Sequence, residues 1–147
     1  MSDEIKKEIL SYLSGHLYLN LATINSNDPA QPHVSTVAYV NEGFDLYFAT
    51  SVKSRKFANL KNNPKVALTI DEDEADWMKI TGLQIEGEAE VVKEDQLPSV
   101  FGIYSDKFPI IKTFPANPDY RFIKITPREA WMLDYRKGFA HRDYLEL

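Results

Sequence analysis

The sequence of 147 residues contains no cysteine, and this absence removes several kinds of chemistry. Without thiols the chain has no disulfide framework, no thiolate nucleophile and no cysteine-ligated zinc or iron–sulfur cluster. A chain without cysteine fits a reducing compartment, and we expect it to be cytoplasmic. Histidine is also scarce: His16, His33 and His141 have no metal-binding spacing, so we interpret each as a structural or surface residue rather than a ligand.

Long hydrophobic runs are missing as well. No stretch approaches the roughly 18 apolar residues of a membrane span, and the first residues, Met1 to Glu4, are acidic rather than basic. The 17 Lys and Arg residues are outnumbered by 22 Asp and Glu residues, which gives a net charge of −5. We therefore expect neither a membrane nor a nucleic acid as a partner.

The remaining composition, with 44% hydrophobic and 27% charged residues, is typical of a globular protein. A chain of this length corresponds to one domain of ordinary size. We expect a single domain over residues 1–147, with an N-terminal helix over 1–15 and a C-terminal tail over 136–147.

The spacing of apolar residues predicts the secondary structure. Helical spacing is found at the N-terminus, around Phe57 and Leu60, and over residues 98–108. Alternating or β-branched runs predict strands over residues 16–24, 34–40, 44–49, 66–70, 80–92, 120–125 and 130–135.

Turn residues predict how these strands are connected. Residues 41–43 join the second and third strands into a hairpin, and residues 126–128 join the last two strands. Gly87 lies in the middle of the longest strand, where a bulge or a barrel bend needs a glycine. The acidic segment 71–76 is interpreted as a solvated loop rather than a metal site.

The order of elements excludes a parallel sheet, because too few helices separate the strands. Closing an antiparallel sheet removes its exposed edges. The sequence therefore predicts a mainly β protein, an antiparallel β-barrel with peripheral helices.

The charge distribution is more informative than the net charge. Residues 46–70 contain no acidic residue and carry +5, so the rest of the chain carries −10. Within this basic segment, residues 50–56 run from a strand end into a helix start, where free backbone N–H groups attract anions. Arg55 and Lys56 suit a terminal phosphate group. The alternative is a surface helix capped by Ser51 or Ser54 whose cations are solvated.

Three segments of the sequence resemble one known family. Residues 49–68 resemble the flavin-phosphate segment of the pyridoxamine 5′-phosphate oxidase-like, FMN-binding split-barrel family, including its Ser-Arg-Lys, Leu and Asn-Pro positions. Residues 82–90 are similar to the following strand of the family, and residues 125–131 to its penultimate strand pair. The three segments occur in the family's order, and the resemblance covers roughly residues 16–134.

The resemblance implies an antiparallel split β-barrel of the FMN-binding type, which forms a homodimer with FMN at the subunit interface. It implies a phosphate group held by Arg55 and Lys56, an isoalloxazine ring along residues 35–38, and a contact from the neighbouring chain through Gln84. The cofactor-binding residues expected on this basis are Ser35, Thr36, Val37, Thr50, Ser51, Ser54, Arg55, Lys56, Gln84 and Trp131. No metal is expected.

The sequence also departs from the oxidases that make pyridoxal phosphate. Ser35 and Val40 stand where those enzymes have Arg and Lys, and residues 140–143 do not match their substrate-binding Arg-Leu-His. These differences predict that pyridoxamine 5′-phosphate is not the substrate. The sequence looks more like the small members of the family, and its tail, with Phe139, His141 and Arg142, could reach across a dimer to cover the flavin.

Three functions follow from these observations. The first is an FMN-dependent oxidoreductase that acts on a small substrate, because FMN supplies the redox chemistry and the chain shows no catalytic triad. The second is a non-enzymatic FMN-binding or electron-carrier protein. The third is a flavin-free split barrel that binds haem or a deazaflavin.

Overall fold

A computed structural model describes residues 2–147 and leaves Met1 outside the described part. Helices α1, α2 and α3 span Ser2–Ser14, Arg55–Asn62 and Leu97–Lys107. The strands are β1 (Tyr18–Ile24), β2 (Pro32–Ala38), β3 (Val40–Glu42), β4 (Asp45–Ser51), β5 (Lys65–Asp71), β6 (Thr81–Val91), β7 (Tyr120–Asp134) and β8 (Arg142–Glu146). Short 3₁₀ turns lie at Trp77–Lys79, Glu94–Gln96, Pro109–Thr113 and Tyr135–Lys137.

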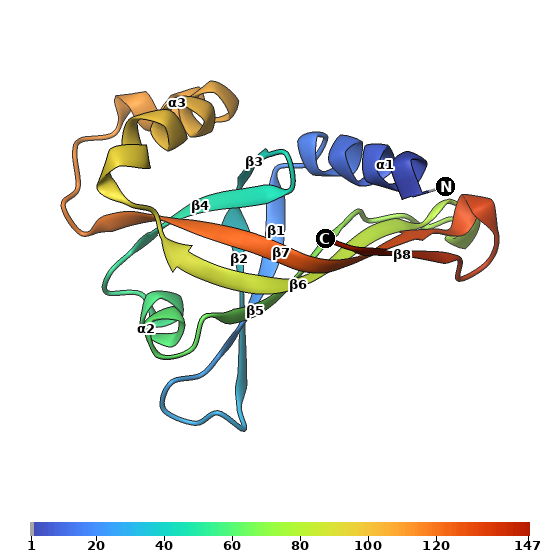
Figure 1. Cartoon of the computed structure of the whole chain (residues 1–147), viewed down its shortest axis with the longest axis horizontal. Coiled ribbons are helices and arrows are strands. Elements are labelled where there is room, and N and C mark those ends of the chain that lie inside the picture. The colour runs from blue at the N-terminus through green and yellow to red at the C-terminus, as the bar shows by residue number, and fades with distance from the viewer. Residues whose placement is uncertain (1) are drawn as a thin grey trace.

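The eight strands form one antiparallel sheet that curves into a half-barrel (Figure 1). Its order is β2-β1-β5-β6-β7-β4-β3, and β8 pairs with β7. β2 approaches β4 without pairing with it, so the barrel is split between these two strands. The predicted mainly β fold with peripheral helices is confirmed.

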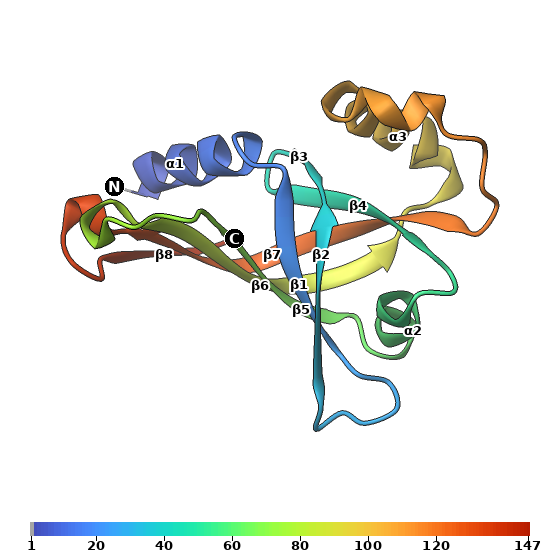
Figure 2. The same cartoon turned by 180° about the vertical axis from the view of Figure 1, so that it is seen from behind.

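The main core fills the concave side of the half-barrel. Alternate residues of the central strands point into it, and α1 adds the buried stripe Ile5, Ile9 and Leu13 at helical spacing. Figure 2 shows α1 above one end of the sheet and α3 above the opposite end, with α2 below the sheet on the side of α3. None of the helices formed by residues 2–147 combines the length and apolar character that a membrane crossing requires.

A second, smaller core lies under α3. Val100 and Tyr104 of this helix pack with Val40 and Tyr47 of the β3–β4 hairpin. The Tyr104 hydroxyl also donates a hydrogen bond to the Ala38 carbonyl oxygen at 3.2 Å. α3 therefore holds both the β3–β4 hairpin and the end of β2 in place.

The predicted hairpin between residues 34–40 and 44–49 is wrong in its pairing. The run 34–40 is interrupted at Tyr39, so that β2 pairs with β1 and only the short β3 pairs with β4. The Tyr39 side chain is fully buried, and its hydroxyl donates to the Leu13 carbonyl oxygen at 2.6 Å. Its backbone N–H donates to Leu17, which holds the bend between the strands.

The predicted turn at residues 126–128 is also wrong, because β7 is one continuous strand of 15 residues. Gly87 pairs with Pro127 whereas Glu86 pairs with Glu129, so Arg128 is the extra residue of a bulge. Proline has no N–H to donate to a ladder, and a bulge tolerates it. The predicted bulge at Gly87 is confirmed.

The C-terminal segment is not a free arm. Residues 142–146 form β8, which pairs along β7 of the same chain, and the preceding turn contacts α1. The Lys137 ammonium lies 2.8 Å from Glu8 and 3.2 Å from Asp143. Residues 142–146 are therefore ordered on their own chain, and the expectation that the tail covers a flavin of a second copy stays a prediction.

Replacing Gly87 by alanine tests the role of the bulge. A Cβ atom at this position would lie 2.4 Å from the backbone oxygen of Thr126 and 3.0 Å from Cα of Pro127, and backbone cannot move aside cheaply. We expect Gly87→Ala to lower the free energy of unfolding by about 1–3 kcal/mol, as overpacking does. Urea unfolding followed by circular dichroism measures the change.

Gly82→Ala is the matched control in the same strand. Its added Cβ would meet its nearest neighbour, the Ile70 carbonyl oxygen, at an ordinary 3.7 Å. We expect a change within about 1 kcal/mol. Equal effects of the two substitutions would contradict the assignment of Gly87 as a position that sterically requires glycine.

Candidate functional site

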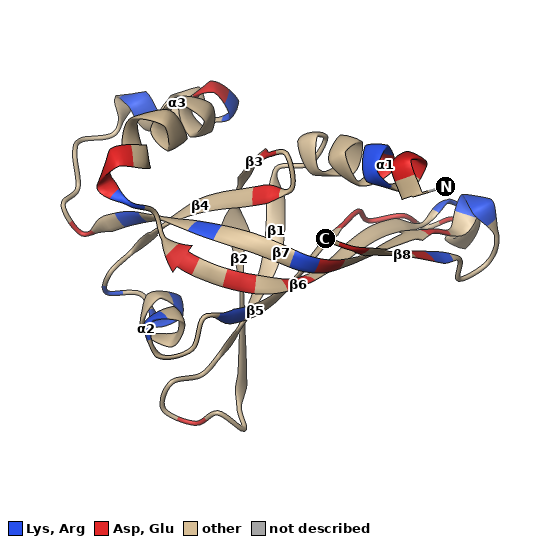
Figure 3. Cartoon of the chain, viewed as in Figure 1, with Lys and Arg blue, Asp and Glu red and all other residues tan. Residues whose placement is uncertain are grey.

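The positive charges of residues 46–70 lie on α2 and on the residues just before and after this helix (Figure 3). Lys53 forms an ion pair with Asp119 at 3.1 Å. Arg55 and Lys56, in the first turn of α2, have no ion pair with any group of residues 2–147, and neither do Lys61 and Lys65. The positive charge at the start of α2 is therefore uncompensated within the chain.

Hydroxyl groups line the connection from β4 to α2. Ser54 is the N-cap, and its Oγ accepts a hydrogen bond from the Phe57 N–H at 3.2 Å. The same Oγ lies 2.8 Å from Oγ1 of Thr50, and Ser51 accepts from the N–H of Lys53. Ser54 is thus the helix cap of the alternative interpretation, and its hydroxyl directly precedes Arg55 and Lys56; phosphate binding there stays a prediction.

The edge strand β2 carries the next part of the site. It pairs with β1 on one edge, and no strand among residues 2–147 pairs with its other edge. Ser35 and Val37 lie on its concave face, where Val37 belongs to the core. The buried Ser35 Oγ has no hydrogen-bond partner, which is unusual for a native protein and fits a site that a ligand completes.

His33 lies on the concave face two residues before Ser35 and was not among the expected site residues. Its ring lies near Arg55 and Lys56, and burial together with these two charges lowers its pKa. The alternation of a β-strand places residues i and i+2 on one face, so the spacing to Ser35 was the available signal. What the sequence did not show is that α2 packs against β1, the strand that pairs with β2.

Other expected residues lie on the opposite, convex face of the sheet. Gln84 pairs directly with Trp131, and the row continues through neighbouring strands. Hydrogen bonds join Thr36 to Asn20 and Asn20 to Thr69, both at 3.2 Å. Across six strands the row reads Thr36, Asn20, Thr69, Gln84, Trp131 and Tyr144.

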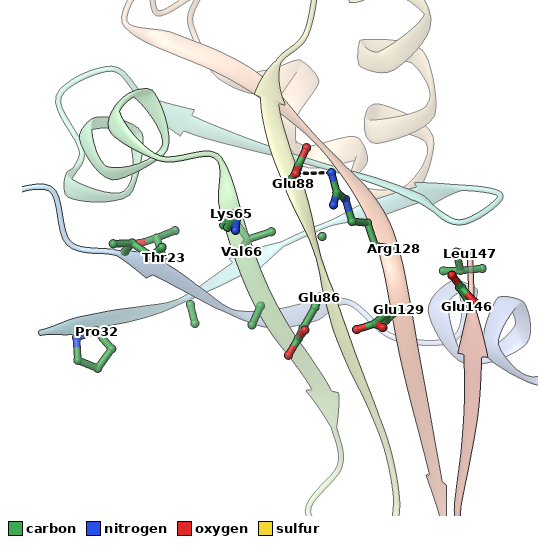
Figure 4. A pocket seen from close by; sticks show the side chains of 14 residues that line it. Thr23, Pro32, Lys65, Val66, Glu86, Glu88, Arg128, Glu129, Glu146 and Leu147 are labelled. Atoms are coloured by element: carbon green, nitrogen blue, oxygen red, sulfur yellow. Dashed lines mark ion pairs between the residues drawn. The ribbon is translucent and has the colours of Figure 1, made fainter. Parts of the chain in front are cut away.

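Two hollows follow this convex face. A shallow groove of about 250 Å³ is lined by Gln84 and Trp131, with Val34 at its β2 end. It adjoins an open depression of about 820 Å³, shown in Figure 4. The far side of this depression is acidic, because the next cross-strand row ends in Glu86, Glu129 and Glu146.

The expected site residues therefore form two clusters in one chain. Ser35 and the β4–α2 residues Thr50, Ser51, Ser54, Arg55 and Lys56 belong to a basic cluster at the split of the barrel. Thr36, Gln84 and Trp131 belong to a convex cluster on the other face. β2 contributes to both, because successive side chains of a strand point to opposite faces.

Comparison with known proteins assigns the family. Residues 5–134 match the sequence model described as pyridoxamine 5′-phosphate oxidase. The chain belongs to this family. A curated relative, general stress protein 26 of Bacillus subtilis (strain 168), is 22% identical over 131 residues, which cover 89% of each chain.

Solved structures of the family share the fold. General stress protein 26 from Bacillus anthracis str. Sterne has a TM-score of 0.72 at 24% identity, with 98% of this chain and 99% of that chain covered. A haem-binding protein from Mycobacterium smegmatis has a TM-score of 0.78 at 17% identity. That match covers 96% of this chain but only 56% of the mycobacterial chain.

Two substitutions at Ser54 separate its capping role from its place in the basic cluster. Ser54→Ala removes the hydrogen bond to Phe57 N–H, and we expect a loss of about 0.5–2 kcal/mol in the free energy of unfolding. Ser54→Asp keeps an N-cap acceptor and should retain near-native stability. Urea unfolding of the two variants checks both values.

The aspartate variant also carries a negative charge into the cluster. We expect it to bind inorganic phosphate more weakly than the wild-type protein, although it folds as well. Undiminished phosphate binding by Ser54→Asp would show that Ser54 serves the helix and has no place beside an anion.

Proposed function

We propose that this member of the family is an FMN-binding flavoprotein and an oxidoreductase for a small organic substrate. The observation that carries the proposal is the basic cluster: Arg55 and Lys56 have no acidic partner and lie beside three hydroxyl groups at a helix N-terminus. A phosphomonoester satisfies such a cluster, since guanidinium, ammonium, hydroxyl and backbone N–H groups all donate to its oxygens.

The residues of the chain would divide the work of holding FMN. Arg55, Lys56 and the hydroxyls would hold the phosphate group, and the unpartnered Ser35 Oγ would find a partner in the ligand. The free edge of β2 offers backbone donors and acceptors to a polar ring edge. When bound, FMN supplies hydride and single-electron transfer.

The proposed site takes its second half from another copy of the chain. Gln84 and Trp131 lie on the convex face of their own chain, away from its Arg55 and Lys56, so the neighbouring copy would bring them to the flavin. Trp131 stacks at a tilt on Tyr144, with ring centroids 5.5 Å apart, and presents a broad aromatic surface. The homodimer is thus part of the proposal, because a single copy holds only half of the site.

Reaction with an electron donor and a substrate distinguishes an enzyme from a flavoprotein that only carries electrons. Anaerobic mixing of the FMN-loaded protein with NADH or NADPH measures whether the flavin bleaches faster than free FMN. Faster bleaching supports the oxidoreductase, whereas an unchanged rate favours an electron carrier. Residues 140–143, which do not match the substrate-binding Arg-Leu-His of the oxidases, support a substrate other than pyridoxamine 5′-phosphate.

A haem-binding function is the second candidate, because the structural neighbour from Mycobacterium smegmatis is described as a haem-binding protein. Haem propionates are anions that Arg55 and Lys56 could also hold. Absorption spectra after separate incubation with FMN and with haemin distinguish the two. Haemin uptake with a Soret shift, in a protein that leaves FMN free, would replace the flavin proposal.

The basic pair can be tested by charge removal with a matched control. We expect the double variant Arg55→Ala, Lys56→Ala to weaken FMN binding by about 100-fold or more, since each charged hydrogen bond contributes about 1.5–3 kcal/mol. Lys61→Ala, Lys65→Ala removes the same charge from the same segment and should change the affinity only slightly. Fluorescence quenching of FMN gives both dissociation constants.

Riboflavin, which lacks the phosphate group, completes this experiment. Its affinity should be the same for the wild-type protein and the Arg55, Lys56 variant. If the two pairs of substitutions weaken FMN binding equally, the effect comes from the overall positive charge of the segment. The proposed phosphate position is then wrong.

Mixed dimers test whether the site is shared between copies. A chain with Arg55→Ala and Lys56→Ala is coexpressed with a chain carrying Gln84→Ala and Trp131→Ala, and the mixed dimer is isolated through two different affinity tags. One of its two sites then has every wild-type residue. We expect each parental dimer to bind FMN weakly and the mixed dimer to bind one FMN with wild-type affinity.

Two outcomes would contradict the shared site. A mixed dimer as weak as its parents would show that both clusters must lie in one chain. A protein that is monomeric by sedimentation while it binds FMN fully would remove the need for a second copy.

A further inference from the structure

His33 is held in a fixed position relative to the basic pair. Its Nδ1 lies 3.3 Å from Oγ1 of Thr23, its cross-strand neighbour on β1. Thr23 in turn accepts a hydrogen bond at 2.9 Å from the amide of Asn59, a fully buried residue of α2. Asn59 also accepts from the N–H of Ser26 at 2.9 Å. The helix that carries Arg55 and Lys56 is thereby tied to the strand that carries His33.

The charges around His33 are all of one sign. Burial is the largest cause that lowers the pKa of His33, and the positive charges of Arg55 and Lys56 lower it further. No acidic side chain of residues 2–147 raises this pKa. Nε2 has no hydrogen-bond partner in the described chain. His33 is therefore a neutral imidazole with one free ring nitrogen beside two uncompensated cations.

We propose that His33 is a third phosphate-binding residue of the basic cluster and takes up a proton from solvent when a phosphate group binds there. The proposal rests on the phosphate site of the proposed function and adds a residue and a proton to it. A phosphate dianion beside Arg55 and Lys56 offsets the charges that oppose protonation. The resulting imidazolium then donates a hydrogen bond to the anion.

The proton makes phosphate binding depend on pH. Because the proton is bound only in the complex, affinity rises as pH falls from above the pKa of His33 in the complex toward its lowered pKa in the free chain. Above this window His33 is neutral in both states and contributes no charge. The phosphate group itself, with a second pKa of about 6, becomes a weaker ligand at low pH, but equally for any protein variant.

The first test uses the unaltered protein. Proton–carbon NMR follows the imidazole signals of His16, His33 and His141 from pH 5 to 9, without ligand, with inorganic phosphate and with FMN. We expect either ligand to raise the pKa of His33 by about one unit or more, which corresponds to a tenfold coupling. The signals of the other two histidines, each hydrogen-bonded to a carboxylate, are recorded in the same spectra as internal references. An unchanged His33 titration would overturn the proposal.

The second test removes the proton acceptor. His33→Gln keeps a polar side chain beside Thr23 but cannot gain charge, and His16→Gln is the control at a histidine outside both clusters. We expect His33→Gln to weaken FMN binding severalfold at pH 6 and less than twofold at pH 8, by loss of the linked proton. Riboflavin binding should be unaffected at both pH values. A loss that is equal at both pH values would reduce His33 to a structural residue and overturn the proposal.

The two proposals can fail separately. If FMN does not bind but inorganic phosphate still raises the pKa of His33, the flavin function is wrong and the role of His33 in an anion site stands. If FMN binds through Arg55 and Lys56 while neither ligand moves His33, the flavin function stands and the inference on His33 is wrong.

Discussion

The pairing of β6 with β7 is the constraint on which the other parts of the fold depend. β7 pairs with β6 along nearly its whole length, and its other edge pairs with β4 first and with β8 afterwards. One edge can take two strands in succession because the bulge opposite Gly87 bends β7 between them. A regular ladder would twist more evenly, and the two halves of β7 would not diverge enough to place β4 and β8 in different parts of the half-barrel.

The position of the basic cluster follows from this bend. β4 is carried toward β2 at the split, and α2 begins only a few residues after β4 ends. Arg55 and Lys56 therefore lie at the split, close enough to His33 of β2 that their charges lower the pKa of its ring. The same curvature leaves the convex face of β5, β6 and β7 open, with Gln84 and Trp131 side by side. One sheet thus presents the two clusters of expected site residues on opposite faces.

Local signals in the sequence predicted most elements, whereas features that depend on distant partners were missed. The strand break at Tyr39 depends on Leu13 and Leu17, and the continuity of β7 depends on Gly87, which is far from Pro127 in the sequence. Proline and a neighbouring threonine look like a turn unless the opposing glycine is known. The resemblance to the family identified the basic pair and the Gln84–Trp131 pair, but only the register of the sheet shows that they lie on opposite faces. His33 was missed because its importance comes from Asn59, which ties α2 to Thr23 of β1, the cross-strand neighbour of His33.

The net charge of −5 says little about which anions the protein can bind, because charges are screened beyond about 8 Å at physiological ionic strength. Two local groups of like charge matter more for anion binding than the net charge does. Glu86, Glu129 and Glu146 lie directly across adjacent strands, where like charges repel, and Arg55 with Lys56 lacks any acidic partner in the described chain. Each imbalance is unfavourable in an isolated copy. In the proposed dimer the convex face of one copy meets the basic cluster of the other, so association relieves both, and a bound phosphate adds the negative charge that the basic cluster still lacks. Carboxylates that approach Arg55 and Lys56 compete with the phosphate for the same cations, so this charge term alone sets the two events against each other. Ligand binding and dimer formation therefore favour each other through the contacts that Gln84 and Trp131 of the second copy would make with the ligand.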